Sequence, residues 1–265
     1  MRHGAPTTRR RGPLVLGVGV LVVAAVVAVV VGARNTGTVG LAQAAPDLTQ
    51  AAVAQDWGAP VRVDEFTGTA VDLGQWAVYD GGGHNNQGVR SPAQATVADG
   101  VLRLTGDDQG TTAGLSMWPG QMYGRWEVRM RVPYGHPDYH PVLALWPQNN
   151  DWPGGGEIDY AEMAATDPGA QFNYLAGATN TWTKSRVDLD ITQWHNYAVQ
   201  WTAQGVRGYI DGREVFVDDD VSHLPPGPMY QTIQLDWIPY VDERPTETVM
   251  DVDWVRIYPV PAGAA

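Results

Sequence analysis

Residues 123–132 read Tyr-Gly-Arg-Trp-Glu-Val-Arg-Met-Arg-Val, and their strict alternation decides the fold class. Every even position from Trp126 to Val132 is apolar, and every odd position from Arg125 to Arg131 is charged. A period of two places the apolar side chains on one face of a β-strand and the charged ones on the other. Further strands are predicted at 101–104, 194–201, 206–210, 214–217, 230–237 and 249–258, with a hairpin turn at Asp211-Gly212.

The composition agrees with a chain of many short strands. Among 265 residues there are 31 Gly and 19 Pro, and no stretch keeps a helical period over three turns, which argues against a helical bundle. Cysteine is absent, which excludes disulfides, thiol nucleophiles and thiolate metal sites, but the chain is long enough to bury a core without them. We therefore predict an all-β fold, a single two-sheet antiparallel β-sandwich.

The charge is divided unevenly along the chain. The net charge is −12, and the residues before Asp47 carry five arginines and no acid, which leaves −17 for the remainder. Such a surface repels nucleic acid and sulfated or carboxylated polymers. We expect a neutral partner molecule, no nucleic-acid binding and a monomeric chain.

The N-terminal part predicts export. Arg9 to Arg11 precede an apolar run over residues 14–31, which is longer than an ordinary signal-peptide core and approaches the length of a membrane-spanning helix. Residues 1–35 are predicted to be a signal peptide or an N-terminal membrane anchor, the anchor lying within 14–33, and both alternatives stay open. The Ala/Gly/Pro-rich residues 36–61 are predicted to be a linker, and 62–260 the catalytic domain, located outside the cell or at its surface.

Three acids within six residues carry the chemistry of this chain: Glu157, Asp159 and Glu162. Glu157 and Asp159 share a face of a strand, whereas Glu162 points the other way unless one extra residue forms a β-bulge between Asp159 and Glu162. A bulged strand would place all three acids in one row. Retaining glycoside hydrolysis uses two such carboxyls about 5–5.5 Å apart, one of which stays protonated and acts as the acid. A solvated strand edge or a calcium loop would explain the same spacing.

The stretch Glu157-Ile158-Asp159-Tyr160-Ala161-Glu162 resembles the E-x-D-x-x-E signature of glycoside hydrolase family 16. Six other stretches resemble motifs of the family in the same order, and together they cover about residues 62–260: Asp64–Phe66, Tyr123–Arg129, Trp152-Pro153, Trp194–Trp201, Tyr209–Gly212 and Asp253–Tyr258. The resemblance implies a concanavalin A-like jelly roll of the laminarinase and licheninase type, with a substrate cleft on its concave sheet. It also implies Glu157 as nucleophile, Asp159 as its helper and Glu162 as acid/base.

The substrate cleft and a metal site are less clearly marked in the sequence. The family's WPAFW strand is replaced by residues 139–146, so the sugar subsites differ from the usual pattern. We expect the following residues to contact sugar: Asn86, Arg90, Trp146, Trp152, Gln234, Asp236 and Trp237. No cofactor is required by this chemistry. The resemblance implies a structural calcium ion held by Asp253 with backbone oxygens near Glu65 and Gly100.

Three classes of function fit these features. The leading one is an exported retaining endo-glycosidase that hydrolyses a neutral β-glucan, with β-1,3 or mixed β-1,3/1,4 linkages, by double displacement. A transglycosylase would use the same nucleophile and differ only in the acceptor. A non-catalytic carbohydrate-binding protein on the same sandwich is the third, although it would not need three convergent acids.

Overall fold

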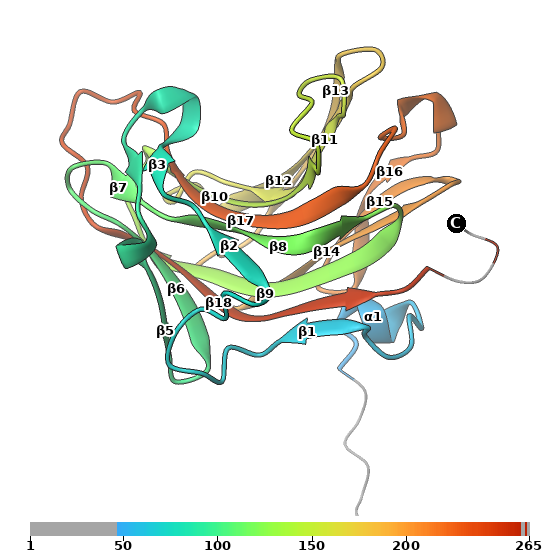
Figure 1. Cartoon of the computed structure of the whole chain (residues 1–265), viewed down its shortest axis with the longest axis horizontal. Helices are drawn as coiled ribbons and strands as arrows, with labels where there is room; N and C mark the ends of the chain where they lie inside the picture. The colour runs from blue at the N-terminus through green and yellow to red at the C-terminus, as the bar shows by residue number, and fades with distance from the viewer. Residues whose placement is uncertain (1–46, 261–262, 264–265) are drawn as a thin grey trace, which may run out of the picture. The chain divides into compact units, whose positions relative to one another are not determined.

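The strand with the clearest alternation lies at the centre of one sheet of a β-sandwich. The computed structural model describes residues 47–260 and 263, and Figure 1 shows β9 beside β18. Trp126, Val128 and Met130 of β9 are fully buried in the core. The first sheet has the order β16-β15-β14-β9-β18-β6-β5, and β1 pairs with the other part of β18. Its strands are β1 (Arg62–Asp64), β5 (Ala95–Ala98), β6 (Val101–Gly106), β9 (Gly124–Tyr134), β14 (His195–Thr202), β15 (Gly205–Ile210), β16 (Arg213–Asp218) and β18 (Thr248–Tyr258).

The second sheet carries the three acids. Its order is β13-β12-β11-β10-β17-β8-β2, all neighbours are antiparallel, and its two sides rise around a concave surface (Figure 1). Its strands are β2 (Trp76–Val78), β8 (Gly114–Gln121), β10 (Tyr139–Pro147), β11 (Glu157–Glu162), β12 (Gly169–Ala176), β13 (Thr181–Asp188) and β17 (Met229–Trp237).

Short elements complete the described part of the chain. A small sheet, β3-β4-β7, stands at one side of the concave sheet and carries the loop from 83 to 88. These elements are β3 (Gly81–Gly82), β4 (Val89–Arg90), β7 (Thr111–Thr112), the helix α1 (Ala51–Ala54) and the 3-10 turns η1 (His84–Asn86), η2 (Pro92–Gln94) and η3 (Val221–His223). The predicted strands and the Asp211-Gly212 turn are confirmed, and both turn residues have positive φ, as a tight hairpin requires.

The region from 47 to 61 is part of the folded domain, which corrects the predicted linker over 36–61. Ala51 and Ala52 are buried on the outer face of the first sheet, where their backbone N–H groups donate to the carboxylate of Glu127. Trp57 packs edge-on against Tyr209 and Tyr258. The folded domain therefore begins before residue 62, because this segment covers Glu127 on the charged face of β9.

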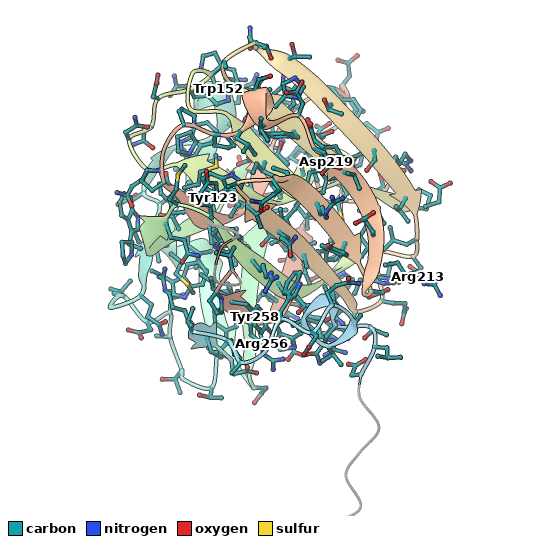
Figure 2. The ribbon with its side chains drawn as sticks, turned by 90° about the vertical axis from the view of Figure 1, so that its right-hand side faces the viewer. Tyr123, Trp152, Arg213, Asp219, Arg256 and Tyr258 are labelled. Carbon is teal, nitrogen blue, oxygen red and sulfur yellow. The ribbon has the colours of Figure 1, made fainter. Side chains whose placement is uncertain are left out.

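This segment lies far from the acids of the second sheet. Figure 2 shows Tyr258 and Arg256 beside α1, and Trp152 at the other end of the view. The predicted leader, residues 1–35, and the first part of the predicted linker lie outside the described residues. In the part of the chain that the structure describes, no helix has the length and apolar character needed to cross a membrane.

Candidate active site

A β-bulge in strand β11 brings the three acids onto one face, as the sequence predicted. Asp159 pairs with Asn173 and Glu162 pairs with Gln171, so three steps along β11 match two steps along β12. The pairing with β10 shifts at the same place. The two residues inside the bulge, Tyr160 and Ala161, both turn into the core. Glu162 thereby returns to the face that carries Glu157 and Asp159.

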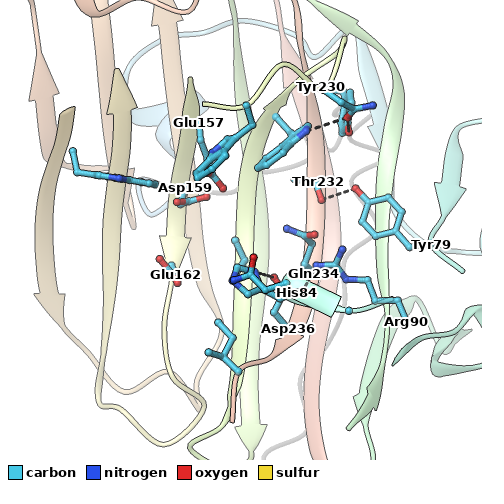
Figure 3. A pocket seen from close by; sticks show the side chains of 18 residues that line it. Tyr79, His84, Arg90, Glu157, Asp159, Glu162, Tyr230, Thr232, Gln234 and Asp236 are labelled. Atoms are coloured by element: carbon cyan, nitrogen blue, oxygen red, sulfur yellow. Dashed lines mark hydrogen bonds and ion pairs between the residues drawn. The ribbon is translucent and has the colours of Figure 1, made fainter. Parts of the chain in front are cut away.

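All three acids line a cavity of about 570 Å³ on the concave sheet (Figure 3). The cavity extends to both sides of β11, from β13 on one side to the small sheet on the other. Its wall combines aromatic faces with amides, hydroxyls and charged groups, as sugar-binding clefts do. The lining residues are Tyr79, Gly83, His84, Asn85, Arg90, Val142, Trp146, Asn150, Trp152, Glu157, Asp159, Glu162, Trp182, Tyr230, Thr232, Gln234, Asp236 and Ile238.

Glu157 and Asp159 form a pair that holds a proton more tightly than isolated carboxyls do. Asp159 is buried, and burial together with the charges of Glu157 and Glu162 raises its pKa well above the ordinary value. Burial also raises the pKa of Glu157, but the indole Nε1 of Trp152 donates a 2.7 Å hydrogen bond to Glu157 Oε2 and opposes this rise. The proton therefore resides on Asp159, and Glu157 remains the ionised member of the pair.

Glu162 has the opposite environment. His140 lies on β10 with its Nδ1 3.8 Å from Glu162 Oε1, and Asn173 Nδ2 donates to Glu162 Oε2. His140, and then Asn173, lower the pKa of Glu162 against the effect of burial. The sequence led us to expect that one carboxyl of the row would stay protonated, and the structure assigns that state to the central Asp159 and not to Glu162.

A second cluster of polar and charged side chains in the cavity surrounds Asp236, which is buried on β17. Arg90 of β4 forms an ion pair with it, and His84 Nδ1 lies 3.8 Å from its other oxygen. The guanidinium of Arg90 also lies 5.3 Å from the ring centroid of Tyr79. These contacts hold the predicted sugar-binding residues Arg90 and Asp236 together at the edge of the cavity, where their remaining hydrogen-bonding atoms can meet hydroxyl groups.

Trp146, Trp152 and Gln234 also lie where the sequence placed them, in the wall of the cavity. The rings of Trp146 and Trp152 are nearly parallel, with an interplanar angle of 4° and centroids 6.4 Å apart. Trp152 exposes 49% of its surface beside Glu157. A flat, half-exposed indole next to a carboxylate suits the apolar face of a pyranose ring.

Two predicted sugar contacts are absent from the cavity wall. Asn86 does not line it, because Asn85 and Asn86 both have positive φ and the loop turns Asn85 toward the cavity. Trp237 lies on the same side of β17 as Leu235, and it packs against the core and beneath Gly88 and Gly110. Its position one residue beyond Asp236 turns it away from the acids, since neighbouring side chains on a strand face opposite ways.

Several residues of the cavity wall were not predicted from the sequence. Tyr230 follows from the same period of two that predicted Gln234 and Asp236, so the signal was present in the sequence. Trp182 lies on the edge strand β13, and only β12 separates this strand from β11. The order of the strands in the sheet therefore brings Trp182 near the acids. Tyr79 and His84 come from loops around the small sheet, where no periodic pattern indicates the direction of a side chain.

The carboxylates at the position expected for calcium are paired with arginines. Both oxygens of Glu65 accept from Arg256, at 2.9 and 3.2 Å, and Asp253 forms an ion pair with Arg129. Gly100 occupies a hairpin turn with φ +77°. Among the described residues, no group of three or more His, Cys, Asp or Glu side chains is arranged to hold a metal ion. Calcium takes oxygen ligands, many of them backbone carbonyls, so the calcium site stays a prediction in which the ion would compete with Arg129 for Asp253.

Comparison with known proteins agrees with this geometry. Residues 83–256 match the sequence model of "Glycosyl hydrolases family 16". The chain is 28% identical over 154 residues to a beta-glucanase of Rhodothermus marinus, covering 53% of this chain and 50% of the relative. It is also 28% identical over 230 residues to the endo-1,3-1,4-beta-glycanase EglC of Rhizobium meliloti, covering 78% of this chain and 47% of the relative. The chain thus spans about half the length of these curated relatives.

Solved structures share the fold at low sequence identity. LamAcat from Zobellia galactanivorans superposes with a TM-score of 0.67 and 20% identity, over 77% of this chain and 99% of that one. A LamA variant from the same organism, in complex with laminaritriose and laminaritetraose, gives a TM-score of 0.66 and 20% identity, over 76% and 99%. The jelly-roll sandwich is therefore confirmed. With a family match over well more than half of its length, the chain belongs to glycoside hydrolase family 16.

Proposed function

We propose that this protein is an exported, retaining endo-glycosidase that hydrolyses a neutral β-glucan with β-1,3 or mixed β-1,3/1,4 linkages. The observation that carries the proposal is the bulge of β11, which puts Glu157 and Glu162 on one face of a cavity lined with aromatic and polar groups. Two carboxyls on one face can act on both sides of a glycosidic bond, one on the anomeric carbon and one on the leaving oxygen.

The proposed reaction proceeds in two displacements. The reacting form of the enzyme carries a proton on Glu162, and the lowered pKa of Glu162 makes this form more abundant as the pH falls. Glu157 attacks the anomeric carbon and forms a glycosyl ester, while Glu162 gives that proton to the departing glycosidic oxygen. Water then attacks the ester, Glu162 takes the proton from that water, and Glu157 leaves as a carboxylate. Asp159 keeps its proton next to Glu157 throughout, which limits the negative charge in the buried row.

The substrate class follows from the wall of the cavity and from the charge of the chain. The −17 charge outside the N-terminal arginines disfavours sulfated or carboxylated polymers, and indole faces suit neutral pyranose rings. The printed names of the relatives, a beta-glucanase and an endo-1,3-1,4-beta-glycanase, support a β-glucan. The cavity has lining residues on both sides of β11, which supports cleavage within a chain.

The nucleophile assignment has a direct test. Glu157→Ala should lower kcat on laminarin or lichenan at least about a thousandfold, and azide should restore turnover with products of inverted anomeric configuration. Wild-type products followed by NMR should retain the anomeric configuration. Glu243→Gln, at an exposed acid away from the cavity, is the matched control and should be fully active. Full activity of Glu157→Ala, or inverted wild-type products, would refute the assignment.

Export is proposed from the sequence of the leader. Arginines before an apolar run favour a segment that enters the membrane with its N-terminus inside, and residues 1–35 have this order. If residues 14–33 stay as an anchor, protein from the native host will fractionate with membranes and begin near Met1. Soluble protein beginning near Arg34 or Ala45 would instead indicate cleavage of a signal peptide.

A further inference from the structure

Trp118 is an exposed aromatic side chain just beyond the cavity, on the same face of the concave sheet. It exposes 40% of its surface, and its ring centroid lies 4.9 Å from that of Tyr230, which lines the cavity. Its indole Nε1 donates to Ser116 Oγ, at 3.0 Å, and Ser116 pairs across the strands with the cavity residue Thr232. Trp118 therefore extends the surface of the cavity toward the edge of the sheet.

Three neighbouring strands each contribute one aromatic ring at the level of Glu157. Leu145 pairs with Ile158, so Trp146 of β10 lies beside Glu157 of β11, and Trp146 pairs directly with Tyr230 of β17. Trp118 of the next strand, β8, packs on Tyr230. The row runs across the strands, away from the acids. Three strand spacings separate β11 from β8, which is roughly 14 Å and more than one sugar ring can span.

The rings of this row are fixed by hydrogen bonds. Asn150 Oδ1 accepts from both Trp146 Nε1 and Tyr230 Oη, each at 3.1 Å. Arg62 of β1 donates to the carbonyl of Trp118 at 2.6 Å and to that of Pro119 at 2.8 Å, which fixes the backbone that carries the outermost ring. An exposed but fixed ring loses little conformational entropy when a flat ligand binds to it.

We propose that Trp118, supported by Tyr230, is a distal sugar-binding site that stacks on a pyranose ring of the glucan several units from the scissile bond. This inference rests on the proposed function, since it names the part of the substrate that the enzyme uses to select long chains. A short oligosaccharide that fills only the cavity does not reach β8, whereas a polymer contacts both the acids and Trp118. The site contributes binding and takes no part in the bond-breaking steps.

The kinetic test compares long and short substrates. Trp118→Ala should raise KM for polymeric laminarin or lichenan about tenfold with little change in kcat, and should leave kcat/KM for the shortest cleaved oligosaccharide unchanged. Trp118→Phe should recover most of the loss because it retains a flat ring. The control is Tyr134→Ala, which removes a comparably exposed ring, 49%, from β9 in the other sheet. Unchanged polymer kinetics in Trp118→Ala, or an equal loss on the shortest substrate, would overturn the inference.

A binding measurement separates this inference from the proposed reaction. In affinity electrophoresis through gels that contain laminarin or lichenan, wild type and Tyr134→Ala should be retarded, and Trp118→Ala should migrate nearly as it does without the polymer. Retardation that depends on Trp118 would uphold the site even if the wild type cleaved no glucan. Hydrolysis of glucan with equal retardation of all variants would uphold the reaction and refute the site.

Discussion

Glu157 and Glu162 are the same residue type five positions apart, and their surroundings give them different proton affinities. Trp152 donates to Glu157 beside the protonated Asp159, whereas His140 and Asn173 favour the ionised form of Glu162. An acid catalyst must carry its proton when the substrate binds. Because the pKa of Glu162 lies below its ordinary value in the free enzyme, we expect an activity optimum on the acidic side of neutrality.

His140→Asn tests the influence of this histidine on Glu162. Removing a group that can carry positive charge raises the pKa of Glu162, so more of the free enzyme keeps its catalytic proton as the pH increases. Because Glu157 has the higher pKa of the two carboxyls, the falling limb of the kcat/KM profile, set by Glu157, should keep its midpoint. The plateau should rise, and the rising limb, set by Glu162, should move to higher pH. The profile is measured on a soluble glucan at constant ionic strength. A uniform loss of activity without movement of the rising limb would mean that His140 acts only in packing.

At the scale of the element, strand β11 carries both core residues and the three acids that we propose to be catalytic. Tyr160 turns into the core because of the bulge, and its hydroxyl donates to Gln231 Oε1 at 2.6 Å. Inserting a glycine between Asp159 and Tyr160 should leave no simple register that aligns the acids, so activity should fall to background. An insertion in the hairpin turn between Asp99 and Gly100 is the control.

Deleting Ala161 provides the complementary variant. It would leave Glu-x-Asp-x-Glu, which places all three acids on one face of a regular strand, so some activity should remain at an altered carboxyl separation. Circular dichroism and thermal unfolding show which variants have folded. A folded insertion variant with full activity would exclude Glu162 as the acid/base and would move the role to another carboxyl, Asp236 first.

The segment around α1 leads to a second prediction at the scale of the element, which concerns the pH dependence of stability. Burial raises the pKa of Glu127 to about 7, although the N–H groups of Ala51 and Ala52 favour its ionised form. Between the ordinary value of 4.5 and about 7 the folded protein binds more protons here than the unfolded chain does, so this group makes the free energy of unfolding decrease as the pH rises. A shift of that size corresponds to about 3 kcal/mol.

Glu127→Gln should remove this contribution. The unfolding midpoint of the wild type should decrease relative to that of the variant as the pH rises from about 4.5 to 7, measured by thermal scans at fixed salt. Glu243→Gln, at an exposed acid, should follow the wild type throughout. Parallel curves for wild type and Glu127→Gln would show that this carboxyl is equally acidic in the folded and unfolded chain.

At the scale of the whole molecule, period and spacing were enough to predict the sandwich and the alignment of the three acids on one face of a bulged strand. The alternation in β9 and the Glu-x-Asp-x-x-Glu spacing are local patterns, and the structure bears out the strand and the bulge. The remainder of the cavity depends on contacts between distant segments. The order of the strands in the sheet places Trp182 in the cavity wall. Asn85 lines the cavity in place of Asn86 because both residues have positive φ angles. Neither the strand order nor these angles can be read from a local sequence pattern.

The effect of calcium on stability is also a property of the whole molecule, because Glu65 follows the first strand and Asp253 lies on the last. Each of these carboxylates is paired with an arginine, Arg256 and Arg129 respectively. Binding of an ion to the folded state alone would raise the free energy of unfolding by about 2.7 kcal/mol at a hundred times its Kd. We expect instead that neither EDTA nor millimolar calcium changes the unfolding midpoint. A midpoint that rises with calcium, saturates, and no longer rises in Asp253→Asn would contradict this expectation. It would mean that the ion displaces the arginines from these carboxylates and that the calcium site implied by the family resemblance exists.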